Sequence, residues 1–218
     1  MPIDRKNYIY VYPLALLTCW IAAWLFHTDL TFLSSNTATD TGYWICAKIV
    51  IWLAPVFLLI GLVEKKGWRQ FLELTTPLKG LLCGLVIGLL LVAVFYGVDR
   101  VFLRHSQPKF LVLNLAVLNG VIVAPLVEEI VFRGFYLRKL LLGDMAFWAA
   151  NGITTVFFVC MHLPGWYFQG RLNLNAVVGL LASLALFSLV LGLVKVKSRS
   201  LYAPIVIHVL NNLYSLAD

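Results

Sequence analysis

The segment LVLNLAVLNGVIVAPLVEEIVFRGFYLRKLLL, residues 111–142, is apolar along most of its length but carries Glu128, Glu129 and Arg133 near its centre. It is longer than the roughly 20 residues that a helix needs to cross a bilayer, so we expect it to tilt, to bend near Pro125 or to project past the membrane. A charge at the bilayer centre costs at least about 2.5–3.5 kcal/mol. The three charged side chains are therefore expected to face the protein interior or a water-filled cavity, and to serve a function.

The composition of the whole chain is that of a membrane protein. Of its 218 residues, 61% are hydrophobic and 12% are charged, whereas a soluble domain is nearer to 45–50% apolar and about 25% charged. We predict an all-α fold, a polytopic membrane helical bundle of about seven transmembrane helices. The expected segments are 8–26, 43–63, 78–98, 111–142, 145–162, 173–194 and 201–216.

The basic residues predict the orientation of these helices, because Lys and Arg accumulate in cytoplasmic loops. Eleven of them fall on one side: Arg5, Lys6, Lys65, Lys66, Arg69, Lys79, Arg138, Lys139, Lys195, Lys197 and Arg199. Four fall on the other side: Arg100, Arg104, Lys109 and Arg171. Lys48 and Arg133 lie inside hydrophobic segments. We predict a multi-pass protein of a prokaryotic plasma membrane, with the N-terminus in the cytoplasm and the C-terminus outside, and the net charge of +7 needs no nucleic-acid partner.

Two simpler expectations concern the cysteines and the first linker. Cys19, Cys46, Cys83 and Cys160 all lie in apolar runs without a Cys-x-x-Cys spacing, so we expect buried, unreactive thiols. Residues 27–42, rich in Ser, Thr, Asn and Asp, are expected to form a polar loop.

The spacing of the charges in residues 111–142 separates their roles. On a helix, Glu129 and Arg133 are four residues apart in the favourable order for an ion pair. Glu128 points away from Arg133 and is left free to act as a general base. The alternative is a charge cluster that only packs helices together.

Two further segments carry polar residues in apolar surroundings. His162 closes the fifth segment just before a Pro-Gly break, where a helix-end histidine bonded to a carbonyl is the alternative. His208 and Asn212 are four apart and share a helix face; hydrogen bonding between helices is the alternative for them. Together these residues and Glu128 supply a base, imidazoles to position water, and donors for an oxyanion. Because no Ser or Cys lies in a recognisable nucleophile motif, water attacking a carbonyl is the favoured reaction.

The set of motifs resembles the CPBP intramembrane proteases, which include the type II CAAX prenyl proteases and the bacterial abortive-infection proteins. The motifs are Glu-Glu-x-x-x-Arg (Glu128, Glu129, Arg133), Phe-x-x-x-His (Phe158, His162) and His-x-x-x-Asn (His208, Asn212). They occur in the order of the family, each on its own expected transmembrane segment. The resemblance covers residues 111–216.

The resemblance implies a role for each motif residue. Glu128 and His162 would activate the attacking water, and His208 and Asn212 would stabilise the oxyanion. Supporting residues would be Glu129, Arg133 and Phe158. We favour a glutamate-type mechanism without a cofactor; in the alternative, zinc is held by Glu128, His162 and His208.

The leading hypothesis is an intramembrane endopeptidase that acts in the lipid bilayer on a membrane protein or a lipidated peptide. A non-catalytic membrane scaffold, chaperone or immunity protein that retains the polar core is the main alternative, and a small transporter with a carboxylate–histidine relay is another. We expect residues 1–218 to form a single membrane domain. Its catalytic core would be residues 111–216, and residues 1–110 would add accessory transmembrane helices.

Overall fold

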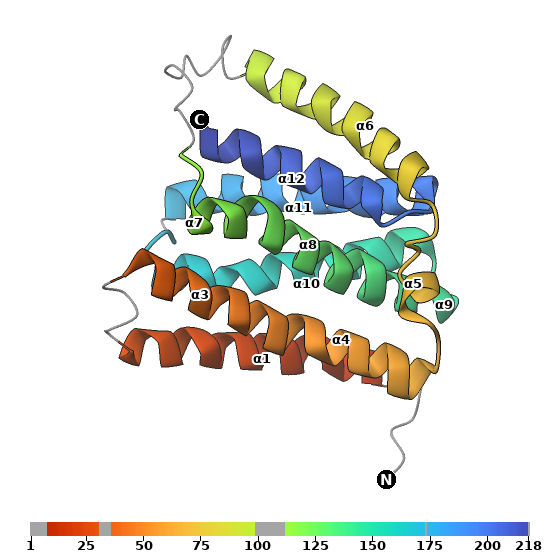
Figure 1. The fold of residues 1–218 in the computed structure, drawn as a ribbon, viewed down its shortest axis with the longest axis horizontal. Coiled ribbons are helices and arrows are strands. Elements are labelled where there is room, and N and C mark those ends of the chain that lie inside the picture. The colour runs from red at the N-terminus through yellow and green to blue at the C-terminus, as the bar shows by residue number, and fades with distance from the viewer. Residues whose placement is uncertain (1–7, 31–35, 99–111, 173, 218) are drawn as a thin grey trace.

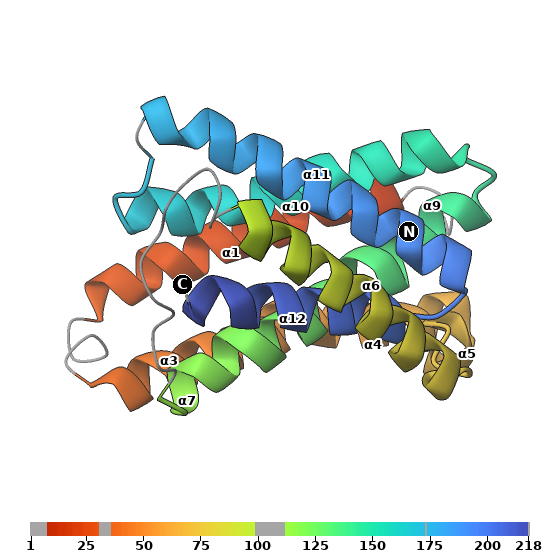
Figure 2. The same ribbon diagram turned by 90° about the horizontal axis from the view of Figure 1, so that it is seen from above.

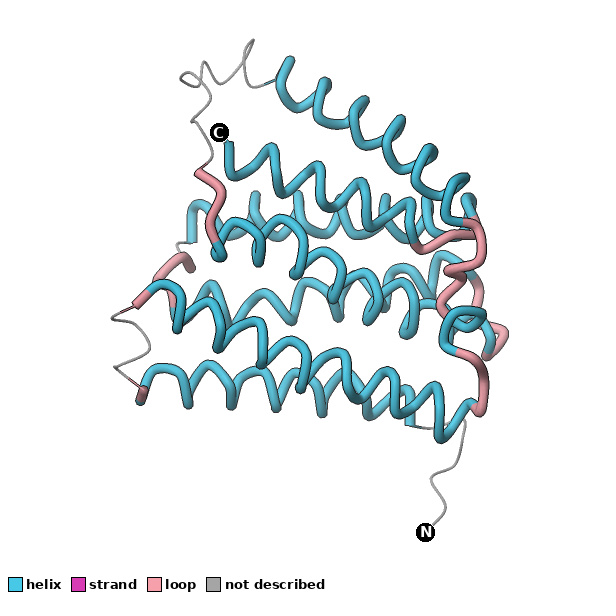
Figure 3. The backbone as a smooth tube through the Cα atoms, in the orientation of Figure 1, coloured by secondary structure: helices cyan, strands magenta, loops and turns pink. Residues whose placement is uncertain are grey.

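Helices make up nearly all of the described chain. The computed structural model describes residues 8–30, 36–98, 112–172 and 174–217, and this part of the chain contains no strand (Figure 3). The helices of the first half are α1 (Tyr8–Asp29), α3 (Thr37–Ala47), α4 (Ala54–Leu58), α5 (Trp68–Phe71) and α6 (Pro77–Val98). Those of the second half are α7 (Leu115–Leu118), α8 (Ala124–Glu129), α9 (Arg138–Leu142), α10 (Phe147–Phe168), α11 (Leu174–Ser198) and α12 (Tyr202–Ala217). Four π-helical stretches interrupt them: η1 (Lys48–Leu53), η2 (Leu59–Glu64), η4 (Asn119–Val123) and η5 (Ile130–Leu137).

The prediction of an all-α membrane bundle is confirmed. Six helical segments of the described chain are long and apolar enough to cross a membrane: Tyr8–Asp29, Thr37–Glu64, Pro77–Val98, Leu115–Leu142, Phe147–Phe168 and Val177–Ser198. The seventh expected segment forms α12, whose 16 residues are fewer than the roughly 20 that span a bilayer. By length, six of the roughly seven expected segments are therefore candidate spans.

The helices pack in two layers (Figures 1 and 2). One layer holds α1, α10 and α11; the other holds α3–α4, α7, α8 and α12, with α6 outermost against α12, and α9 lies beside α10. The helix Leu115–Leu142 lies between these neighbours, and all eight residues of η5 are buried. Glu128, Glu129 and Arg133 are all buried, as predicted from the cost of a charge in lipid.

Close packing of α6 on α12 depends on three glycines spaced four residues apart, Gly80, Gly84 and Gly88. A Cβ at Gly84 would lie 2.6 Å from the carbonyl oxygen of Ala203, and one at Gly88 would lie 2.6 Å from a methyl group of Leu210. Small residues at this spacing let membrane helices approach closely. The stripe fixes α6, from the first half of the chain, against the helix that carries His208.

Charged side chains tie the loops together at one end of the bundle. We call Glu64, Glu73, Arg138, Lys139 and Lys195 the end cluster. Glu64 accepts from Lys139 at 2.6 Å, and Glu73 pairs with both Arg138 and Lys195. Three of the basic residues predicted to be cytoplasmic, Arg138, Lys139 and Lys195, therefore lie together at one end of the bundle. Which side of the membrane this end faces stays a prediction.

Several predicted boundaries were wrong. The fifth segment does not end at His162, because α10 continues through Pro164 to Phe168; membrane helices tolerate proline where neighbouring groups satisfy the freed carbonyl. The sixth extends to Ser198, so Lys195 and Lys197 lie on the helix. The predicted polar loop 27–42 is helical from Thr37 onward, and residues 31–35 lie outside the described chain.

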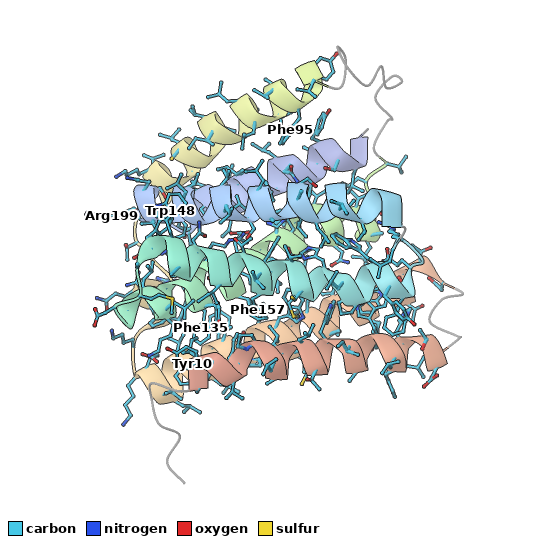
Figure 4. The ribbon with its side chains drawn as sticks, turned by 180° about the vertical axis from the view of Figure 1, so that it is seen from behind. Tyr10, Phe95, Phe135, Trp148, Phe157 and Arg199 are labelled. Carbon is cyan, nitrogen blue, oxygen red and sulfur yellow. The ribbon has the colours of Figure 1, made fainter. Side chains whose placement is uncertain are left out.

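The prediction of four buried cysteines was also wrong. Cys19 and Cys46 are exposed, and Cys83 and Cys160 are half-buried. Apolar runs give no burial information here, because the lipid-facing surface of a membrane protein is as apolar as its core. Tyr10 and Trp148, which are labelled in Figure 4, are examples of large apolar side chains on the outer surface, because both are more than 60% exposed.

Candidate active site

Helix α8, which carries Glu128 and Glu129, is a six-residue stretch between two π-helical stretches, η4 and η5. Such departures from α-helical geometry in the middle of a helix are frequent at functional sites. Both carboxylates are buried. At about 1.5 Å per residue, Glu128 lies about 21 Å from the loop 143–146 and His162 about 22 Å from it along α10, so the two side chains reach the same depth.

Glu129 lies at the centre of a network of buried side chains. Its Oε1 accepts from Nη1 of Arg133 at 2.8 Å and from Nδ1 of His208 at 2.8 Å. Nη2 of Arg133 donates to the carbonyl and to the hydroxyl of Ser188, at 3.1 and 2.8 Å, and that hydroxyl also contacts Thr155. The ion pair expected between Glu129 and Arg133 is present, and it also orients His208.

The ring and the carbonyl of Phe158 make separate contacts with the charged residues. The guanidinium carbon of Arg133 lies 4.5 Å from the ring centroid of Phe158, on its face, which is favourable for a cation on an aromatic face. The backbone carbonyl of Phe158 accepts from Nδ1 of His162 at 2.8 Å. The spacing Phe-x-x-x-His therefore places an imidazole on the carbonyl one helical turn before it.

The two imidazoles approach the same oxygen of Glu128. Nε2 of His162 lies 3.9 Å from Oε2 of Glu128, and Nε2 of His208 lies 3.8 Å from it. That Oε2 atom is buried and makes no hydrogen bond within the described chain. The three side chains come from α8, α10 and α12, so the fold brings together Glu128, His162 and His208.

The hydrogen bonds at Nδ1 decide what the imidazoles present to Glu128. A carbonyl and an ion-paired carboxylate can only accept, so Nδ1 of His162 and Nδ1 of His208 both carry the proton. In the neutral rings, each Nε2 is then an acceptor, and so is the carboxylate of Glu128. In that form each Nε2 lies 3.8–3.9 Å from a further acceptor, Oε2 of Glu128.

Asn212 lies apart from this group. Its amide donates to the carbonyl of Gly120 at 2.9 Å and its oxygen accepts from Asn211 at 3.3 Å. It thus links α12 to η4, one turn from His208. Its expected part in binding the oxyanion stays a prediction.

A cavity of about 200 Å³ opens beside Glu128 and His162. Its other lining residues are Trp20, Trp24, Lys48, Trp52, Met161, Gly165, Trp166, Gln169 and Arg171. Four of these residues come from α1 and from the helix Thr37–Glu64, for which the sequence predicted only an accessory role. One signal was available, because Lys48 stands inside an apolar segment, where a charge marks a functional site.

The side chains expected to hold zinc in the alternative mechanism are of suitable types. However, no group of three or more His, Cys, Asp or Glu residues within the described chain has an arrangement that could hold a metal ion. Glu128, His162 and His208 therefore do not fit a metal site as they lie here. We derive no step through zinc, and the absence of a cofactor stays a prediction.

Residues 109–214 match the family described as type II CAAX prenyl endopeptidase Rce1-like. This region is Rce1-like. It makes up just under half of the chain and contains every motif residue from Glu128 to Asn212. The resemblance predicted from the three motifs is confirmed, and the Rce1-like region supports a protease. No curated protein and no solved structure matches the chain.

Proposed function

We propose that the protein is an intramembrane endopeptidase in which Glu128 activates a water molecule for attack on a peptide bond. The observation that carries the proposal is the convergence of both imidazoles on one oxygen of Glu128: Nε2 of His162 lies 3.9 Å and Nε2 of His208 lies 3.8 Å from Oε2. The Rce1-like match supports the choice of a peptide bond as the substrate. Glu128 and His162 also line the cavity of about 200 Å³.

The chemistry follows from the positions of these acceptors. One proton of the water points to Glu128 and the other to His162, which directs an oxygen lone pair toward the substrate carbonyl carbon. As the carbon–oxygen bond forms, the first proton passes to Glu128, and the carbonyl oxygen becomes an oxyanion. When the carbon–nitrogen bond breaks, Glu128 returns that proton to the leaving amine.

The oxyanion needs donors, for which His208 and Asn212 are proposed. His208 can donate from Nε2 only when both ring nitrogens are protonated, and the carboxylate of Glu129 at Nδ1 offsets the positive charge of that form. Asn212 would have to leave Gly120 to contribute its amide. Loss of one such donor typically lowers the rate 10²–10³-fold.

Glu129, Arg133 and Phe158 are proposed as positioning residues. Glu129 holds His208, Phe158 holds His162, and Arg133 lies between Glu129 and the ring of Phe158. Each imidazole is therefore fixed on its Nδ1 side, which leaves Nε2 toward Glu128.

The substrate is proposed to be a membrane-associated or lipidated protein, because the reacting groups lie inside a bundle of membrane-spanning length. The matching family is that of a type II CAAX prenyl endopeptidase, so prenylated CAAX peptides are the first to be tried. The proposed location is a prokaryotic plasma membrane. The distribution of Lys and Arg supports an orientation with the end cluster in the cytoplasm.

The test compares the termini of membrane proteins in cells that carry the wild-type protein or Glu128→Gln at matched expression. Glutamine keeps the shape of the side chain and removes the base. We expect new termini with the wild-type protein alone. Identical termini, with both proteins shown to be folded, would refute the protease and favour the scaffold.

A further inference from the structure

The mechanism proposed above leaves one half-buried cation unused. Lys48 begins η1 and lies near the middle of the membrane-spanning helix Thr37–Glu64. It lines the same cavity as Glu128 and His162. A lysine at this depth is costly in lipid, and it lies outside the Rce1-like region. Because Lys48 is costly at this position and lies beside Glu128, we expect Lys48 to have a function of its own.

The contacts of Lys48 fix its position and leave donors over. Its Nζ donates to the side-chain oxygen of Asn119 in η4 at 3.0 Å. An ammonium group has three donors, and among the described residues no carboxylate forms an ion pair with it. Glu128, on the same cavity, is the charged group that acts on Lys48 over a longer distance.

Other residues of the cavity also provide donors or positive charge. Arg171 contributes a second cation, and it is exposed. The indole N–H groups of Trp24 and Trp52 are buried and have no hydrogen-bond partner within the described chain. A buried donor without a partner costs about 1–3 kcal/mol. The two cations of the cavity and the remaining donors of Lys48 favour an anion.

We propose that Lys48 is a specificity-determining residue that binds a carboxylate of the peptide substrate close to the scissile bond. The proposal rests on the proposed function, because only a peptide substrate makes a carboxylate the anion to expect. Ammonium–carboxylate hydrogen bonds are about twice as strong as neutral ones, and tryptophan walls exclude the water that would weaken them. The carboxylate is either the C-terminal group of the chain or an Asp or Glu side chain.

Binding of three fluorescent peptides to the full-length Glu128→Gln protein in lipid nanodiscs tests the proposal. All three are prenylated and end in a CAAX sequence: the first has a free C-terminal carboxylate, the second is its amide, and the third is an amide with one glutamate among its last three residues. We expect at least one carboxylate peptide to bind about tenfold more tightly than the plain amide. The first peptide would identify the C-terminal group and the third a side chain.

Substitutions at Lys48 decide whether this residue causes the preference. Lys48→Gln is expected to reduce the tenfold difference to less than about twofold, and Lys48→Arg to keep most of it. Lys197→Gln, at an exposed lysine on α11, is the matched control and should change nothing. Equal binding of acid and amide peptides, or a preference that survives Lys48→Gln in a protein of unchanged melting temperature, would overturn the proposal.

Cleavage by the protein with Glu128 intact separates the two proposals. Lys48-dependent binding of carboxylate peptides without any cleavage would refute the protease and leave the carboxylate site in place. Cleavage of acid and amide peptides with equal kcat/KM, slowed equally by Lys48→Gln, would support the protease and overturn the role of Lys48 in specificity.

Discussion

The end cluster and the charged residues at the centre of the bundle use the same side-chain types in different ways. In the end cluster both carboxylates contact a Lys or Arg: Glu64 pairs with Lys139, and Glu73 with Arg138 and Lys195. We call Glu128, Glu129, Arg133, His162 and His208 the central cluster. There Glu129 is paired in the same manner, but Oε2 of Glu128 has no hydrogen-bond partner in the described chain. Both carboxylates of the end cluster are paired with a cation, whereas the central cluster holds one carboxylate, Glu128, without such a partner in the described chain.

The ion pair between Glu129 and Arg133 is not well explained by its contribution to the free energy of unfolding. Glu129 and Arg133 have no exposed side-chain surface. Removing two charges from water costs about as much as their attraction returns, so a buried ion pair is weak evidence for stability. Its contribution here is more readily explained by the orientation of His208 through Glu129.

The first prediction, which has the largest expected effect, tests the proposed catalytic role of Glu128 in the central cluster. Glu128→Gln is expected to lower kcat/KM by about 10²–10⁴-fold, because general-base catalysis contributes that much. The melting temperature should stay close to that of the wild type, since Oε2 of Glu128 makes no hydrogen bond. Cleavage of a prenylated CAAX peptide and thermal unfolding in detergent measure the two quantities. Retention of full activity would remove Glu128 from the reaction.

The second prediction concerns the buried ion pair of the central cluster, Glu129 and Arg133. Arg133→Met is expected to lower the free energy of unfolding by about 3–5 kcal/mol, because it leaves the carboxylate of Glu129 buried without a cation. Adding Glu129→Met should recover much of this loss, while activity stays low for want of a fixed His208. Unfolding in denaturing detergent compares the two variants. A double variant no more stable than the single one would contradict this account.

The third prediction addresses the end cluster. Glu73→Gln is expected to cost about 1–3 kcal/mol of stability, because it leaves the buried Lys195 without its carboxylate. The kcat/KM of the folded protein should equal that of the wild type. Glu64→Gln is the matched variant within the same cluster and should behave alike. A large loss of activity at preserved stability would show that the two clusters are not separate.

The last prediction concerns the removal of zinc, for which we expect no effect on activity. Treatment with a zinc chelator should leave kcat/KM unchanged and the purified protein should contain far less than one zinc per chain, if Glu128 works without a metal. Cleavage in chelator with and without added zinc, together with metal analysis, measures this. Loss of activity that zinc restores would establish the alternative in which Glu128, His162 and His208 are ligands.

The residues that could be predicted from the sequence are those whose relation is local. The pair Glu129–Arg133 follows from helical spacing alone, and the structure contains it. The meeting of Glu128 with His162 and His208 depends on three helices, and it was suggested only by the complementary chemistry of these residues and by the resemblance to a family. The break expected at Pro164 was wrong because tertiary packing in a membrane overrides a local rule.

Lys48 was noted in the sequence but was not connected with the candidate active site. Its position inside an apolar segment was visible, but spacing along one helix gives no information about which cavity the residue lines. Its partner Asn119 is 71 positions away in the chain. The burial of the cysteines failed for a related reason, since composition does not distinguish a lipid-facing side chain from one that faces the core.

The walls of the cavity have a practical consequence for studying this protein in solution. Four of the seven tryptophans of the chain, Trp20, Trp24, Trp52 and Trp166, line it, and a fifth, Trp44, has its ring centroid 4.1 Å from that of Trp24. The intrinsic ultraviolet fluorescence of the molecule therefore originates mainly around one small volume. A peptide or an ion that enters that volume reports its own arrival through the emission spectrum, without any attached dye.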